Sequence, residues 1–258
     1  MLKKFSFDDI DFSQNTKNRH IVCAGSSESG KSYFIKTLIK HKMHHFKQIL
    51  IICGIEDIKE YKNELKEIGV NPNDSKFTYI PRLSFRTDEE KLKTTDEFLT
   101  DVIKKYIANG TTHIKKLTVL DDILESSDNI AKGAMKYLLM RSRHNNNITI
   151  MTFHMFNKDF GSFIKSNLNY MFAFTVGLEE DNLKPIRATI KAYITNILNR
   201  KNIKEIDFYE AKNRTELKEN RREFINKFYS KFINPQRHFV LFKKIPVPEI
   251  CIGNPVKN

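Results

Sequence analysis

The chain of 258 residues lacks the features that mark secreted and disulfide-rich proteins. It has no tryptophan, three cysteines, 7 prolines and 9 glycines, so there is little to suggest a stapled or low-complexity fold. Cys23 and Cys53 fall within apolar runs, where cysteine behaves as a small hydrophobe, and no paired spacing appears. This usage favours a reducing compartment.

Long apolar runs are also missing. No stretch approaches the roughly 20 residues that a transmembrane helix needs. The start, "MLKKFSFDDIDFSQ", is interrupted by Asp8 and Asp9 before the apolar region of a signal peptide could form. We therefore expect an intracellular, soluble protein with no membrane span.

Acidic residues are scarce in the last part of the chain. The whole sequence carries 44 Lys and Arg against 31 Asp and Glu, a formal net charge of +13. Residues 184–258 contain 17 basic and 7 acidic residues, so a net charge of +10, out of the total of +13, lies in this segment. This asymmetry favours a polyanionic partner, although a solvated helix face is the commoner reason for a charge run.

Apolar strands alternate with amphipathic helices along the chain. Expected strands lie at 19–24, 47–55, 76–81, 115–123, 147–154 and 169–176, with another at 238–243. Expected helices lie at 31–46, 57–70, 87–110, 129–144 and 204–231. The alternation predicts an α/β fold with a mostly parallel sheet and helices on both faces. We divide the chain into an N-terminal arm (1–18), a core (19–200) and a basic C-terminal helical extension packed on the core (201–258).

A phosphate-binding loop follows the first predicted core strand. "GSSESGKS" matches G-x-x-x-x-G-K-[ST] in full, between a strand and a helix. Gly25 and Gly30 permit the tight backbone, and the loop amides face a phosphate at the positive end of the helix dipole. Lys31 is expected to reach the β- and γ-phosphates, and Ser32 to bind Mg²⁺. The predicted nucleotide-binding residues are Gly25, Ser26, Ser27, Glu28, Ser29, Gly30, Lys31, Ser32 and Tyr33.

A second metal anchor is expected at the end of a neighbouring strand. "LTVLDD" places Asp121 and Asp122 directly after apolar residues. Asp121 is predicted to hold Mg²⁺ through water, and Asp122 to orient and deprotonate the attacking water. An Asp pair in this position can also serve only to turn the chain and cap the next helix.

Polar residues around the 147–154 strand are further candidates. His154 ends this strand, with Thr152 behind it, and is the candidate sensor of the γ-phosphate. Arg143 precedes the strand and is a candidate arginine finger reaching a neighbouring subunit's nucleotide, with Arg141 a weaker one. A strand-end histidine is more often ordinary surface, and a helix-end arginine often only binds terminal carbonyls.

The segments "AGSSESGKS", "LTVLDDI" and above all "RSRHNNNITIMTFH" resemble the genome-packaging ATPases of large DNA viruses and virophage-like elements, a branch of the FtsK/HerA group. The resemblance covers roughly residues 19–180, and that family more often has glutamine where this chain has His154. It implies a P-loop NTPase fold of the RecA-like (ASCE) type, with ATP and Mg²⁺ as cofactors. It also implies a homo-oligomeric ring on double-stranded DNA that drives DNA into a capsid.

The resemblance further implies a capsid or portal component as partner. The place of action would be the host cytoplasm, a viral assembly site or the virion. Two other classes of protein remain open. A P-loop small-molecule kinase would need an Arg-rich lid, which we do not find. A non-catalytic nucleotide-binding assembly protein is the other class, and the intact Lys31, Ser32 and Asp121 argue against it.

Overall fold

The computed structural model describes residues 2–12, 20–81, 95–108, 113–122, 133–153, 168–174, 239–243 and 249–253. Within these residues, nine strands form one sheet. They are β1 (Leu2–Lys4), β2 (His20–Ala24), β3 (Gln48–Cys53), β4 (Phe77–Pro81), β5 (Lys116–Leu120), β6 (Asn147–Phe153), β7 (Leu168–Phe174), β8 (Phe239–Lys243) and β9 (Glu249–Gly253).

The strand order explains how distant motifs meet. It runs β1-β9-β8-β7-β2-β6-β5-β3-β4, and the six strands from β7 to β4 are all parallel. β6 lies between β2, which leads into the glycine-rich loop, and β5, which ends at the aspartate pair. The predicted α/β fold with a mostly parallel sheet is therefore confirmed.

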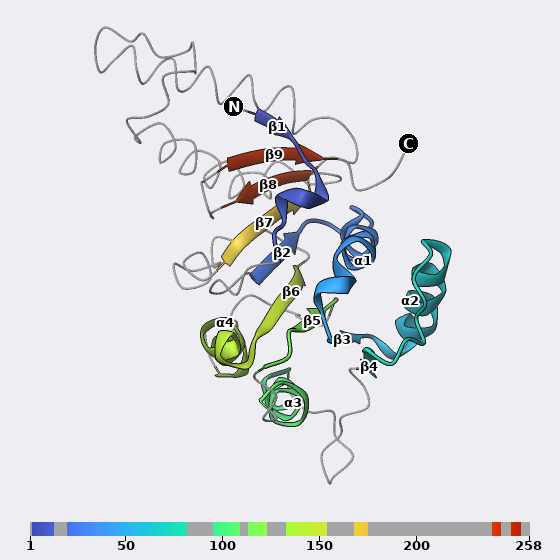
Figure 1. The fold of residues 1–258 in the computed structure, drawn as a ribbon, viewed down its shortest axis with the longest axis vertical. Coiled ribbons are helices and arrows are strands. Elements are labelled where there is room, and N and C mark those ends of the chain that lie inside the picture. The colour runs from blue at the N-terminus through green and yellow to red at the C-terminus, as the bar shows by residue number, and fades with distance from the viewer. Residues whose placement is uncertain are drawn as a thin grey trace, which may run out of the picture.

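Helices cover both faces of the sheet (Figure 1). Helices α1 (Lys31–Lys42) and α2 (Ile55–Glu67) lie on one side, and α3 (Thr95–Val102) and α4 (Gly133–Arg141) on the other. α3 continues as a π-helical turn (Ile103–Ile107), and 3-10 turns follow α1 (Met43–His45) and α4 (Ser142–Asn145). Within the described residues, no helix is long and apolar enough to cross a membrane.

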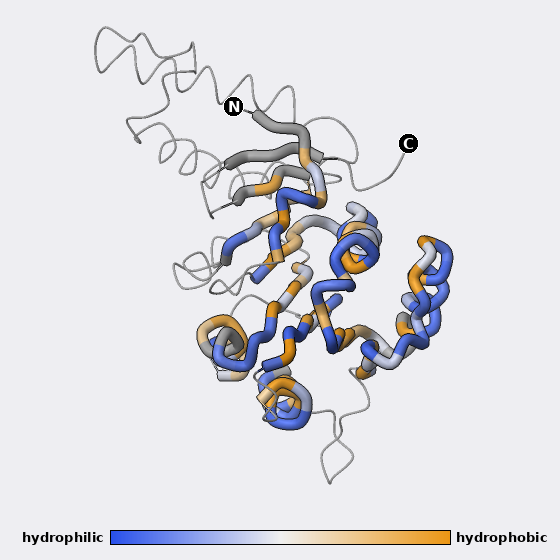
Figure 2. The backbone as a smooth tube through the Cα atoms, in the orientation of Figure 1, coloured by the Kyte–Doolittle hydropathy of each residue, from blue (hydrophilic) through white to orange (hydrophobic). Residues whose placement is uncertain are grey.

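Apolar side chains fill the space between the helices and the sheet. α1 buries Phe34, Ile35, Leu38 and Ile39 on the face predicted from their spacing. The core strands beneath are almost fully buried and mostly apolar, as expected for parallel strands covered on both faces. In Figure 2 hydrophobic and hydrophilic colours both occur along the strands, while the outer face of α2 is largely hydrophilic.

The two ends of the chain pair with each other in the sheet. β1 runs parallel to β9, and β8 joins β9 to β7 in antiparallel register. Neither β1 nor β9 was expected from the sequence. The N-terminal segment also places Ile10 and Phe12 in the core and packs the Phe5 ring on Phe34 and Phe172, at centroid distances of 5.9 and 5.7 Å. It is thus part of the main structure.

Several predicted features lie outside the described residues. They include His154, the basic helix expected at 204–231, residues 87–94, 109 and 110 of the helix expected at 87–110, and the proposed boundaries at 18 and 200. The boundaries remain a proposal.

Candidate functional site

The glycine-rich loop is held at the carboxyl end of β2 by its neighbours on both sides. The backbone N–H of Gly25 donates to the Phe153 carbonyl oxygen at the tip of β6 (3.0 Å). A Cβ atom on Gly25 would lie 2.7 Å from Cβ of Phe174 on β7, so only glycine fits there. Gly30, at the start of α1, has φ of 91°, the left-handed conformation that glycine adopts without strain. The sequence pattern therefore marks two positions where a side chain is excluded.

Lys31 lies across this loop. Its Nζ donates to the carbonyl oxygens of Gly25 (2.8 Å) and Ser26 (2.5 Å), and approaches Oγ of Ser29 (3.5 Å). The residue is only 8% exposed. Burial lowers the pKa of Lys31, while the nearby Asp122 and Asp121 carboxylates raise it. The ammonium is thus held over the loop, where an anionic phosphate would be a stronger partner than a carbonyl.

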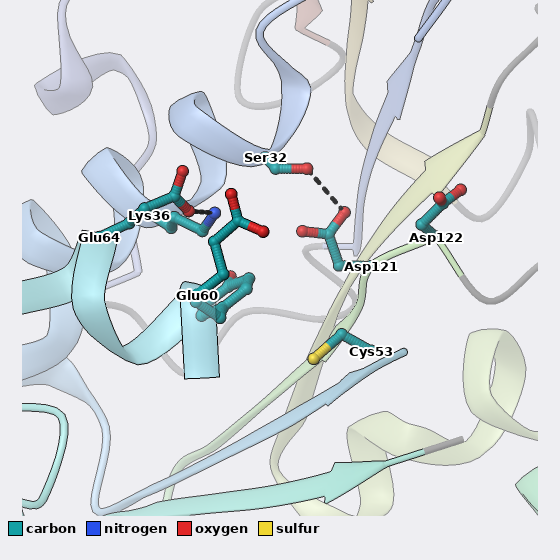
Figure 3. A pocket seen from close by; sticks show the side chains of 8 residues that line it. Ser32, Lys36, Cys53, Glu60, Glu64, Asp121 and Asp122 are labelled. Carbon is teal, nitrogen blue, oxygen red and sulfur yellow. Dashed lines mark hydrogen bonds and ion pairs between the residues drawn. The ribbon is translucent and has the colours of Figure 1, made fainter. Parts of the chain in front are cut away.

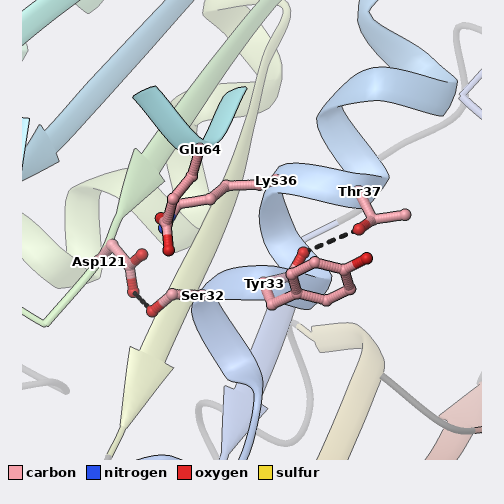
Figure 4. A network of polar contacts seen from close by, with 6 residues as sticks. All are labelled: Ser32, Tyr33, Lys36, Thr37, Glu64 and Asp121. Atoms are coloured by element: carbon pink, nitrogen blue, oxygen red, sulfur yellow. Dashed lines mark hydrogen bonds and ion pairs between the residues drawn. The ribbon is translucent and has the colours of Figure 1, made fainter. Parts of the chain in front are cut away.

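Ser32 and Asp121 meet as the two motifs predict. Oγ of Ser32, in the first turn of α1, donates to Oδ1 of Asp121 at the end of β5 (3.3 Å; Figures 3 and 4). Hydroxyl and carboxylate oxygens suit Mg²⁺, which is usually bound by one or two protein oxygens plus water and substrate phosphate. Within the described residues, no three His, Cys, Asp or Glu side chains lie close enough to hold a metal. The hydroxyl of Ser32 and the carboxylate of Asp121 would fit a magnesium ion that the nucleotide helps to bind.

Asp121 is a buried carboxyl group, 4% exposed. Burial raises its pKa, whereas the Lys36 ammonium and hydrogen bonds from Ser32 and Thr152 act in the opposite direction. A divalent cation would favour the ionised form much more strongly than these neighbours do.

Asp122 is exposed and conformationally unusual. Its φ of 54° is left-handed, a region that non-glycine residues seldom adopt. Its backbone N–H donates to Oγ1 of Thr152 on β6 (2.7 Å), and the same hydroxyl hydrogen-bonds Asp121. Thr152 therefore holds both aspartates against β6. This contact is more than a chain turn requires, and it separates the two carboxyl groups, as Figure 3 shows.

Five residues absent from the sequence-based site line a cavity beside it. The cavity has a volume of about 240 Å³ and opens beside Ser32 and Asp121, and these five residues in its wall are Lys36, Cys53, Glu60, Tyr61 and Glu64 (Figure 3). A signal for Lys36 was available, because it follows Ser32 by four residues on a helix and so shares its face. Nothing in the local sequence distinguishes Glu60 and Glu64 from the other acidic residues of α2.

The structure does not place the two remaining candidate residues, Arg143 and His154, at this site. Arg143 belongs to the 3-10 turn before β6, whereas the glycine-rich loop lies at the carboxyl ends of the strands. β6 has seven residues and spans about 20 Å, so Arg143 lies at the opposite end of the sheet from its own loop. His154 lies outside the described residues. The structure thus brings together Lys31, Ser32, Asp121 and Asp122, but not Arg143.

The sequence family described as "Poxvirus A32 protein" matches residues 5–214. This chain belongs to that family. The match covers the arm, both nucleotide motifs and the segment around Arg143 and His154, which confirms the resemblance to viral genome-packaging ATPases. Among curated protein sequences, no significant match was found.

Solved structures share the fold of this A32-family chain. The genome-packaging NTPase B204 of Sulfolobus turreted icosahedral virus 2, in complex with AMPPCP, is 15% identical and has a TM-score of 0.57. The comparison covers 93% of this chain and 98% of that one. The pCW3 conjugation coupling protein TcpA, bound to ATPγS, is 11% identical and has a TM-score of 0.50. That comparison covers 96% of this chain and 68% of TcpA. The expected P-loop NTPase fold is confirmed.

Proposed function

We propose that this protein hydrolyses ATP with Mg²⁺ and uses the energy to move double-stranded viral DNA into a capsid. The observation that carries the proposal is the meeting of Ser32 and Asp121 beside a lysine held over a glycine-rich loop, in a chain of the A32 family. B204, which shares the fold, is a packaging NTPase captured with AMPPCP and with ATPγS. The setting would be the infected host cell.

The described residues supply binding and proton chemistry in distinct places. The loop from Gly25 to Tyr33 binds the phosphates, with Lys31 neutralising their charge. Ser32 and Asp121 would hold Mg²⁺, which would supply charge neutralisation at the phosphates when bound. The exposed carboxylate of Asp122 accepts the proton of the attacking water. His154 follows the β6 tip that already contacts both the loop and Asp122, so we retain it as the γ-phosphate sensor.

Assembly into a homo-oligomeric ring would complete the site. Because Arg143 lies at the far end of the sheet from its own loop, it can act as an arginine finger only towards a neighbouring subunit. Duplex DNA and a capsid or portal component are the proposed partners, and the basic residues of 201–258 are the proposed DNA contact.

One measurement separates the alternatives: ATP turnover by the purified protein with and without duplex DNA. A DNA motor shows Mg²⁺-dependent hydrolysis that duplex DNA stimulates. Hydrolysis that DNA leaves unchanged, together with phosphate transfer to a small acceptor, would identify a kinase. Nucleotide binding without turnover under every condition would identify a non-catalytic assembly protein.

A further inference from the structure

The cavity beside the magnesium subsite has an unusual charge pattern. Four carboxyl groups line it, from Glu60, Glu64, Asp121 and Asp122, and among the described residues of its wall Lys36 provides the one ammonium. Ser32 and Asp121 belong to the site already described, whereas Glu60, Glu64 and Lys36 come from the side facing α2. The cavity is therefore shared between the nucleotide site and a helix that takes no part in the chemistry proposed above.

Lys36 is fixed in this cavity by contacts with α2. It is 6% exposed and forms an ion pair with Oε2 of Glu64. Its Nζ also lies 4.4 Å from the ring centroid of Tyr61, within range of a cation–π interaction. Figure 4 shows the ends of the Lys36 and Glu64 side chains meeting close to Asp121.

The ion pair is half-buried, since the side chain of Lys36 is 7% exposed and that of Glu64 39% exposed. Such a pair adds little net stability, because desolvation of the ammonium offsets much of its attraction to a partly solvated carboxylate, so an apolar pair would join α1 to α2 equally well. What an apolar pair could not supply is a positive charge near Asp121 together with an anion that balances it. Lys36 alone would repel an incoming divalent cation, and Glu64 offsets that repulsion.

We propose that Lys36 and Glu64 are positioning residues of the magnesium subsite, where Glu64 keeps the Lys36 ammonium away from Asp121 and the pair together sets the affinity for Mg²⁺. This inference rests on the proposed function, since it concerns the same site. It gives α2 a role, because Glu64 lies on this helix and without its carboxylate the Lys36 ammonium would be unbalanced near Asp121.

The test uses the full chain and equilibrium binding of a fluorescent, non-hydrolysable ATP analogue, titrated with Mg²⁺. Lys36→Met removes the repelling charge and should lower the Mg²⁺ concentration needed for half-maximal binding, by about tenfold. Glu64→Gln leaves the ammonium unbalanced and should raise it by about tenfold. The double variant should return close to the wild-type requirement, because both charges are gone.

Matched controls lie on the same two helices. Lys40→Met on α1 and Glu67→Gln on α2 change exposed residues outside the cavity and should leave the Mg²⁺ requirement unchanged. Lys36→Arg keeps the charge and should retain the wild-type requirement. Thermal unfolding of each variant without nucleotide reports any structural damage separately.

The outcomes distinguish this inference from the proposed function. If Lys36→Met and Glu64→Gln shift the Mg²⁺ requirement in the same direction, or only lower thermal stability, the pair is a structural link and the inference is wrong. If wild-type binding does not depend on Mg²⁺, and Ser32→Ala has no effect, the proposed magnesium site itself is wrong. Opposite shifts with recovery in the double variant support both.

Discussion

At the scale of single residues, the chemistry open to a side chain in this site depends more on its contacts than on its residue type. Asp121 and Asp122 are adjacent in sequence, yet one is buried and hydrogen-bonded to Ser32, and the other is exposed with a left-handed backbone. Two neighbouring carboxyl groups therefore have different chemical capacities, and we expect them to respond differently to the same substitution.

Replacing Lys31 with alanine should lower ATP turnover by about 100-fold or more, because the phosphates lose a preorganised positive charge. The fold should persist, since the lysine's hydrogen bonds are local to the loop and its burial is costly. Turnover and thermal unfolding measured on the same preparation test this. Near-normal hydrolysis by Lys31→Ala would mean that the loop does not bind the reacting phosphates.

The two aspartates can be separated by conversion to asparagine. Asp122→Asn should still bind Mg-ATP but hydrolyse it about 100-fold more slowly, since an amide accepts no proton. Asp121→Asn should weaken Mg²⁺ binding about tenfold and lower nucleotide affinity with it. Binding of a fluorescent nucleotide and single-turnover hydrolysis distinguish the two. Equal and mild effects of both changes would reduce the pair to a turn and a helix cap.

At the scale of secondary-structure elements, β6 is central because it contacts both motifs. Its tip hydrogen-bonds the loop through Phe153 and the aspartates through Thr152. Its beginning is tied to β2, where the backbone N–H of Thr149 donates to Nδ1 of His20 (3.2 Å). The same imidazole hydrogen-bonds the Leu139 backbone in α4, so His20 joins three elements.

His20 should make the stability of the protein depend on pH. Burial lowers its pKa from 6.5 to about 4, so the unfolded chain binds a proton before the native state does. Its stabilising contribution is therefore complete above pH 6.5 and is lost as the pH falls from 6.5 towards 4, by about 3 kcal/mol in all.

Urea unfolding of the wild type and of His20→Asn between pH 7.5 and 4 measures this effect. Asparagine retains an acceptor for the Thr149 N–H but does not titrate, so the variant should be less stable at pH 7.5 and show a flatter pH dependence. If the free energies of unfolding of the two proteins changed equally with pH, His20 would not be the cause of the pH dependence.

The turn that carries Arg143 gives a prediction about assembly. If this arginine acts across a subunit interface, Arg143→Ala and Asp122→Asn proteins should each be inactive alone. Mixed, they should recover part of the activity, because some interfaces then combine an intact Asp122 with an intact Arg143. ATP turnover against mixing ratio measures the recovery. No recovery in an assembly shown to exchange subunits would exclude a finger in trans.

At the scale of the whole molecule, the sheet joins the ends of the chain. β8 and β9 follow the basic segment and return the chain to β7 and β1. The part of the sequence between β7 and β8, residues 175–238, is therefore joined at both of its ends to neighbouring strands of the same sheet.

We expect duplex DNA to bind the basic segment, and reversing the charge of three of its residues tests this. Lys218, Arg221 and Arg222 share one face of the helix expected at 204–231. Changing all three to glutamate should weaken duplex binding without sequence preference. It should also flatten the salt dependence of binding, by about 0.9 of log–log slope for each phosphate that the protein no longer neutralises. Basal ATP turnover should remain, since the nucleotide motifs lie elsewhere in the chain.

Fluorescence anisotropy at several salt concentrations measures the slope. Lys59 and Lys66, on the outer surface of α2, provide a control pair for conversion to glutamate and should leave the slope unchanged. An unchanged slope in the triple variant would place the DNA contact on another part of the protein.

The sequence by itself determined most of the elements and the loop motif. The core strands and α1 followed from the spacing of apolar residues, Gly25, Lys31 and Ser32 from a loop motif whose geometry is local, and the aspartate pair from its place directly after an apolar strand. Only the tertiary structure decided which elements became neighbours: the pairing of β1 with β9, the place of β6, and the contact of Ser32 with Asp121, 89 residues away. It also placed Lys36 against Glu64 and separated Arg143 from its own loop. Such contacts depend on how whole elements pack, and no local pattern of side chains encodes them.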